Sequence, residues 1–242
     1  PSVSFPGTEN RTLAAGPSAS GEYADCATRK AENPMSRFAE KGLLGLIVLL
    51  SLALNLSVLD DKHGWGDDWA QYVAPARGVV EGDVAREVTA SRFRNEHSSR
   101  PFGPTVAMWG FPVLIAPVYA IAGADLLAPK LPGILLFLPF PVTLPALFRD
   151  SLGAASCLLL VALFAFNPYL IRFNNQILTD VPFLFYSSFS LLLIDRFIVK
   201  RKFWLSEAFS FVLLGVFLFL AFWTRIVGVL LVVTALLCHV IE

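Results

Sequence analysis

The feature that most constrains this chain is an uncharged apolar run at residues 42–59, GLLGLIVLLSLALNLSVL. At about 1.5 Å per residue, a helix of this length approaches the thickness of a hydrocarbon core of about 30 Å. Further apolar segments follow at residues 109–124, 131–148, 154–170, 181–199, 205–223 and 226–241. The sequence therefore predicts an all-α fold, a polytopic transmembrane helical bundle.

Composition supports a membrane protein. Charged residues make up 16% of the chain, which is too few to coat a soluble globule whose residues are 55% hydrophobic. The formal net charge of zero gives no reason to expect a nucleic-acid partner. Cys26, Cys157 and Cys238 stand far apart, so neither a disulfide framework nor a zinc site is indicated.

The charges that flank the first run predict its orientation. Basic residues precede it at Arg29, Lys30, Arg37 and Lys41. Acids follow it, beginning with Asp60. Because basic residues favour the cytoplasmic side, we expect a cytoplasmic N-terminus and an external loop at residues 60–105. Residues 1–36 have the composition of a disordered cytoplasmic tail, which leaves 37–242 as the transmembrane domain.

The same charge rule places two later residues outside. The basic stretch at residues 196–202 belongs on the cytoplasmic side, which puts Asp180 and Arg225 at the external ends of the flanking segments. Three apolar segments lie between the end of the external loop at residue 105 and Asp180, which is also external. Three crossings cannot return the chain to the side from which it started. We therefore expect one segment to be re-entrant, interfacial or fused with its neighbour. Prolines make 109–124 and 131–148 the candidates.

The external loop carries a helical pattern at residues 67–81. Apolar side chains recur on one face at Trp69, Tyr72, Val73, Ala76, Val79 and Val80. Asp67 precedes this stripe at a position suited to an N-cap, and Gly82 follows it at the position of a C′ glycine. We expect a short amphipathic helix on the membrane surface.

Four residues are candidates for chemistry, each with a structural alternative. Asp67 and Asp68 either cap the loop helix or provide a general base for an acceptor hydroxyl. Asp180 either caps a helix that has Pro182 in its first turn or is a functional carboxylate at the membrane boundary. Arg225 either extends its charge to the membrane surface or binds a lipid phosphate.

A metal site is only weakly indicated. His63 and His97 could bind a divalent cation together with the acids, but neither stands at a typical ligand spacing. We assign no metal ligand. Asp195 and Arg196 are interpreted as charges at a membrane boundary.

Four stretches resemble the polytopic glycosyltransferases of the GT-C type. They are GDDWAQYVAPARGVVEG, MWGFPVLIAPVYAIAG, NPYLIRFNNQILTDVPFLFY and LAFWTRIVGVLLV. In this order they are similar to the protein-mannosyltransferase-like group of glycosyltransferase family 39, which includes bacterial aminoarabinose transferases. The resemblance covers about residues 40–242.

The resemblance implies a function for each candidate. Asp67 would be the catalytic base, with Asp68 as the second acid of the pair; Asp68 stands where many members have Glu, which leaves open which acid is the base. Asp180 would be a second carboxylate of the site, and Arg225 would contact the donor phosphate. The donor would be a sugar on a polyprenyl or dolichyl phosphate, transferred with inversion to an acceptor that the sequence does not identify.

Two other functions remain open from the residues alone. Asp180 and Arg225 could line the pathway of a transporter, or the chain could be a catalytically inactive membrane partner. Members of the resembling group carry further spans, so we also expect the chain to be the N-terminal part of a longer protein.

Overall fold

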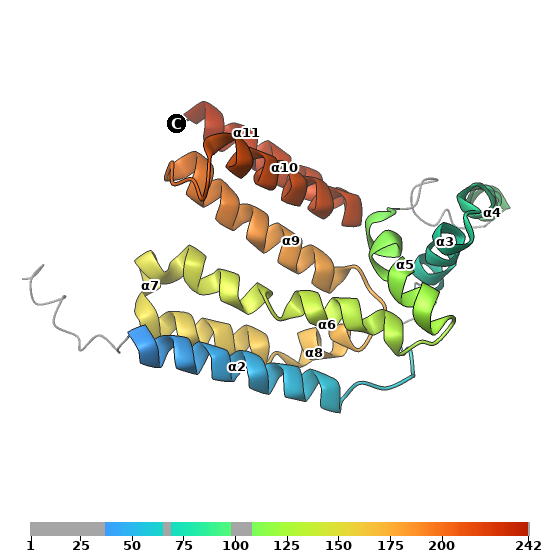
Figure 1. Ribbon diagram of the computed structural model, residues 1–242, viewed down its shortest axis with the longest axis horizontal. Coiled ribbons are helices and arrows are strands. Elements are labelled where there is room, and N and C mark those ends of the chain that lie inside the picture. The colour runs from blue at the N-terminus through green and yellow to red at the C-terminus, as the bar shows by residue number, and fades with distance from the viewer. Residues whose placement is uncertain (1–36, 65–68, 98–107, 242) are drawn as a thin grey trace, which may run out of the picture. The chain divides into compact units, whose positions relative to one another are not determined.

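The structure is a computed structural model that describes residues 37–64, 69–97 and 108–241. The chain divides into two units, Pro1–Arg37 and Phe38–Glu242, and the contacts below lie within the second. All regular elements of the described ranges are helices (Figure 1). Four are long and apolar enough to cross a membrane: Arg37–Ser57, Ala128–Ala165, Asp180–Val199 and Glu207–Thr224. The predicted polytopic helical bundle is confirmed, whereas the expected tail at 1–36 lies outside the described residues.

The longest apolar element reverses direction at Gly153. It comprises η1 (Ala128–Lys130), α6 (Leu131–Phe137) and α7 (Phe140–Ala165). Within α7, Gly153 has φ 75° and ψ 173°, a conformation that glycine adopts without the steric cost of a Cβ. The chain therefore forms a helical hairpin, with one arm on each side of Gly153.

Contacts with α2 (Arg37–Ser57) fix the direction of both arms. Arg149 pairs with Glu40 near the start of α2, whereas Lys130 contacts Asp60, beyond the end of that helix. The first arm therefore runs antiparallel to α2. In the second arm, Ala165 accepts a hydrogen bond of 2.8 Å from the Ser51 hydroxyl, so this arm returns parallel to α2.

These contacts define two ends of the bundle. We call the end with Glu40, Arg149 and the Gly153 turn the hairpin end, and the end with Asp60 and Lys130 the loop end. The hairpin end also contains Lys200, whose ammonium lies 3.2 Å from Asp150 and 2.9 Å from Asp195. Asp195 and Arg196 lie at this end, as their interpretation as boundary charges requires.

The C-terminal half adds three antiparallel helices (Figure 1). The first is α9 (Asp180–Leu193), which continues as the π-helix η2 (Ile194–Val199). It is followed by α10 (Glu207–Thr224), by the short η3 (Ile226–Gly228) and by α11 (Val229–Ile241). Their apolar core contains Leu193, Ile194, Phe197, Ile198, Leu214 and Ala235. Asp180 and Arg225 meet where α9 begins and α10 ends, so both belong to the loop end.

Segment 109–124 is the one that does not run along the bundle. It forms α5 (Gly110–Ala122), which is one of the shorter apolar helices. Figure 1 shows α5 beside α3 (Ala70–Glu81) at the loop end, with α4 (Val84–His97) following α3. The rings of Phe111 and Tyr72 are 5.2 Å apart, and Gly110 packs against the backbone of Trp223. Segments 131–148 and 154–170 are the two hairpin arms, so 109–124 is the one of the three segments that stands apart from the bundle.

The stripe predicted on the loop helix packs against protein. Tyr72, Val73 and Ala76 of α3 lie in a cluster with Phe111 of α5 and Ile177. Val80, the last member of the stripe, is exposed. The helix ends as predicted, because Gly82 adopts φ 74° and donates its N–H to the carbonyls of Gly78 and Val79.

The start of the loop helix differs from the prediction. The sequence places Asp67 at the N-cap, but the helix begins at Ala70 and Trp69 occupies the N-cap position, without a side-chain hydrogen bond. Asp67 and Asp68 lie outside the described residues. Trp69 and Tyr72 instead contribute to the apolar cluster with α5, and this packing fixes where the helix is anchored.

Buried amides connect α2 to α8, the helix that follows the hairpin. Asn174, at the end of α8 (Pro168–Asn174), donates to the Asn55 side-chain oxygen at 2.7 Å. The Asn55 amide in turn donates to the Ser51 carbonyl at 2.8 Å. All three residues are buried. The Asn174 side-chain oxygen itself is buried without a hydrogen-bond partner among the described residues, so the Asn174–Asn55 bond is the polar link of this ladder between α2 and α8.

Candidate active site at the loop end

Asp180 and Arg225 form an ion pair at the loop end, whereas the sequence predicted only that they lie on the same side. Arg225 donates through Nη1 to Asp180 Oδ1. The side chain of Asp180 is 40% exposed and that of Arg225 is 39% exposed, so the pair remains accessible to a ligand. The guanidinium also lies 5.9 Å from the centre of the Phe183 ring, one turn along α9. At this distance the cation is attracted electrostatically by the face of the aromatic ring.

The backbone around Asp180 explains its position. Asp180 is the first residue of α9, and the N-cap is Thr179, which makes no side-chain capping bond. The alternative in which Asp180 caps the helix is therefore wrong by one residue. A carboxylate in the first turn is still stabilised by the positive end of the helix dipole. Asp180 thus has two favourable partners, the helix terminus and Arg225.

Arg225 stands at a break between two helices. Its backbone is extended, with φ −146° and ψ 134°, between the end of α10 and the start of η3. Two glycines make this break compact. A Cβ on Gly228 would lie 2.5 Å from the Ala221 carbonyl carbon, and one on Gly110 would lie 2.7 Å from that of Trp223. Both glycines therefore pack closely against the backbone at the end of α10, just before Arg225.

A second polar cluster at the loop end surrounds Lys130, whose side chain has no exposed area. Its ammonium donates to the carbonyl oxygens of Asp60 at 2.7 Å and Lys62 at 2.6 Å, and to Asn175 Oδ1 at 3.1 Å. The Asp60 carboxylate provides the opposite charge at 3.5 Å. Sequence reasoning missed Lys130, although an isolated lysine at the start of an apolar segment is by itself a signal of a functional or paired charge.

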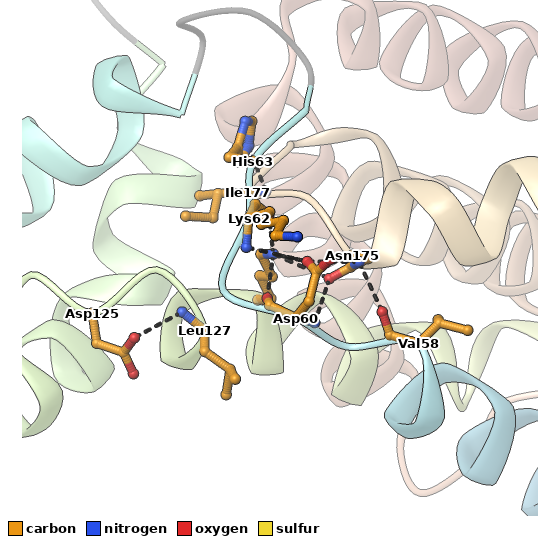
Figure 2. Close-up of polar contacts among 9 residues, drawn as sticks. Val58, Asp60, Lys62, His63, Asp125, Leu127, Asn175 and Ile177 are labelled. Carbon is orange, nitrogen blue, oxygen red and sulfur yellow. Dashed lines mark hydrogen bonds and ion pairs between the residues drawn. The ribbon is translucent and has the colours of Figure 1, made fainter.

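Asn175 and His63 join the loop to the connection before α9. Asn175 donates to the Val58 carbonyl at 2.9 Å and to Asp60 Oδ1 at 3.1 Å (Figure 2). His63 Nε2 accepts a hydrogen bond of 3.1 Å from the backbone N–H of Ile177. Ile177 lies three residues before Asp180 in the sequence. The loop that follows α2 and the segment that carries Asp180 are therefore connected at two points.

These contacts keep Asp60 ionised. Burial raises the pKa of the Asp60 carboxyl, but hydrogen bonds from Asn175 and from the backbone N–H of Lys62 oppose that effect. Together with the charge of Lys130, they hold the pKa below its usual value. The lowered pKa favours the ionised carboxylate beside the buried ammonium and makes Asp60 a poor general base.

Two of the predicted site residues are brought together and two are not described. Asp180 and Arg225 meet, whereas Asp67 and Asp68 fall in residues 65–68, which the structure does not describe. His63 contacts Ile177, and His97 stacks on Phe93 at 4.0 Å. Among the described residues, no three His, Cys, Asp or Glu side chains form a group that could hold a metal ion.

Comparison with known proteins supports the resemblance seen in the sequence. Residues 131–242 match the family model described as dolichyl-phosphate-mannose-protein mannosyltransferase. The match confirms that this chain is similar to the GT-C type mannosyltransferases, and the matched range contains Asp180 and Arg225. No curated protein and no solved structure matches the chain.

Proposed function

We propose that this protein is a membrane glycosyltransferase that transfers a sugar from a polyprenyl- or dolichyl-phosphate donor to an acceptor at the external face of the membrane. The observation that carries the proposal is the accessible pair of Asp180 and Arg225. It lies within the range that matches the mannosyltransferase family and at an end of an apolar bundle. A lipid-phosphate donor presents its phosphate at that depth.

Arg225 is proposed to bind the donor phosphate. A guanidinium has five N–H donors in a planar fork, and within the described residues the only side-chain acceptor recorded for Arg225 is Asp180. The remaining donors suit two phosphate oxygens. As the bond to the sugar breaks, negative charge grows on the leaving phosphate, and a preorganised cation stabilises it. Asp180 would hold the guanidinium in the orientation that this requires.

Asp67 is proposed as the general base, with Asp68 as the second acid of the pair. The acceptor hydroxyl would attack the anomeric carbon from the face opposite the phosphate, and the base would take its proton. The sugar–oxygen bond of the donor breaks as the new bond forms, so the phosphate leaves with the electron pair. A single displacement of this kind inverts the anomeric carbon.

The external position of the site is proposed from charge. The hairpin end contains Arg149, Lys200 and the adjacent Arg201 and Lys202, and basic residues favour the cytoplasmic side. The loop end would then face the periplasm, the lumen or the cell exterior. One helix, α2, separates Lys41 from Asp60. A single crossing by this helix would put the N-terminus on the cytoplasmic side.

The base assignment is tested by Asp67→Asn and Asp68→Asn in the membrane-inserted protein. Sugar transfer from a polyprenyl-phosphate donor should be abolished by the substitution at the base and reduced by the other, because an amide cannot take the proton. Asp61→Asn is the matched control, since Asp61 is an exposed acid in the same loop with no assigned chemistry. Full activity in both Asp67→Asn and Asp68→Asn would refute the mechanism.

A further inference from the structure

Lys130 is held by a complete set of acceptors. An ammonium has three N–H groups, and the three closest oxygens belong to Asp60, Lys62 and Asn175, at 2.6 to 3.1 Å. Two of these oxygens are backbone carbonyls, which remain in place whatever the side chain. A lysine without exposed area and with all its donors engaged cannot contact a substrate. Its role is therefore exerted through the segments that it joins.

Those segments are the two that carry the proposed carboxylates. Asp60 and Lys62 lie in the chain that leaves α2 and leads into the external loop. Asn175 lies in the connection between α8 and α9, five residues before Asp180. The contact of His63 with the Ile177 N–H, seen in Figure 2, joins the same two segments a second time.

We propose that Lys130 is a positioning residue for the transfer reaction: its ammonium holds the start of the external loop against the connection that carries Asp180. This inference rests on the proposed function, because it assigns Lys130 the task of fixing the loop relative to the donor site. It differs from the role of Arg225, which touches the donor. Loss of Lys130 should therefore impair catalysis without weakening donor binding.

The first test is independent of activity. Lys130→Met keeps the aliphatic stem and removes the three N–H donors. Hydrogen–deuterium exchange of the full chain in a membrane mimetic should show faster exchange at Asp60 and Ile177, whose N–H groups are bonded to Asn175 and His63. Amides in the middle of α10 should be unchanged. Lys200→Met, which removes an ammonium at the hairpin end, should leave the loop amides protected.

The second test separates positioning from binding. In Lys130→Met, kcat should fall about 100-fold, as expected for a shift of about 1 Å in a reacting group, while the KM for the lipid-linked donor stays unchanged. Asn175→Leu, which removes one of the three acceptors, should show a smaller fall of the same kind. If Lys130→Met does not fold, its amides will exchange rapidly throughout the chain. In that case Asn175→Leu decides whether this cluster positions the loop.

Each contrary result has a definite meaning. Unchanged hydrogen–deuterium exchange at Asp60 and Ile177 would contradict the proposal that Lys130 holds the loop against the connection that carries Asp180. Faster exchange with unchanged kcat would overturn the positioning role, and a rise in donor KM alone would make Lys130 a binding residue. If the unmodified protein transfers no sugar, the proposed function fails, whereas the exchange experiment still decides whether Lys130 holds the loop.

Discussion

The guanidinium of Arg225 donates to the carboxylate of Asp180, although 45 residues separate them in the sequence. Antiparallel packing of α9 and α10 brings the start of one helix beside the end of the other. Each residue lies at a helix terminus, so the pair is accessible from outside the apolar core. Under the proposed function, this accessible cation binds the charged headgroup of the donor.

Substitutions of this pair should have different kinetic effects. Arg225→Met should raise the donor KM and lower kcat by about 100- to 1,000-fold, because it removes donors to the leaving phosphate. Asp180→Asn should lower kcat without raising the donor KM, since the guanidinium keeps its charge but loses its fixed orientation. Steady-state kinetics with a polyprenyl-phosphate sugar measure both. Arg172→Met, at an exposed arginine of the same end, is the control. Equal effects of the two substitutions on KM would contradict the separate roles.

The two ends of the bundle should differ in accessibility across the membrane. In a variant without Cys26, Cys157 and Cys238, a cysteine replacing Lys62 should react with a membrane-impermeant maleimide in intact cells. A cysteine replacing Lys202 should react only after permeabilisation. Both positions are exposed, so a difference reports sidedness rather than burial. The reverse labelling pattern would place the site on the cytoplasmic side.

Gly228→Ala should destabilise the break that holds Arg225. The added Cβ would meet backbone atoms of Ala221 and Phe222 at 2.5 Å, and backbone cannot rotate away as a side chain can. We expect a loss of about 1–3 kcal/mol, measured as a lower midpoint of thermal unfolding in detergent, together with weaker donor binding. Gly215→Ala in the preceding helix, α10, is the control, because nothing lies within 4 Å of its Cβ position.

In contrast to Gly228→Ala, Gly215→Ala should stabilise α10 by about 0.5–1 kcal/mol, the usual gain from replacing a glycine in a helix. Equal midpoints for the two variants would show that the close approach at Gly228 does not constrain the fold.

The buried amides of Asn55 and Asn174 should be coupled. Asn174→Leu removes the donor at 2.7 Å and leaves the Asn55 oxygen without that bond, at a cost of about 1–3 kcal/mol. The double variant Asn55→Leu/Asn174→Leu should cost less than the sum of the two single substitutions. Thermal unfolding of the four proteins gives the coupling energy, for which about 0.6 kcal/mol is typical between membrane helices. Strict additivity would indicate that the amides do not depend on each other.

The positions of the helices could largely be predicted from the sequence, and their partners could not. Apolar runs predicted α2, the hairpin arms and α9 to α11 within a few residues, because hydrophobic length is a local property. Charge alone placed Asp180 and Arg225 at one end. The start of α3 was predicted three residues too early, because packing of Trp69 and Tyr72 against α5 decides it.

By itself, the sequence determined that the chain is a membrane bundle and predicted that Asp180 and Arg225 lie at one end of it, since span length and flanking charge are read along one dimension. Only the tertiary structure decided that the chain reverses at Gly153, that segment 109–124 lies at the loop end, and that Asp180 meets Arg225. It also revealed Lys130, whose acceptors come from segments 68 and 45 residues away. Such contacts depend on the rotation and depth of each helix in the bundle, which are set by the packing of all the helices together.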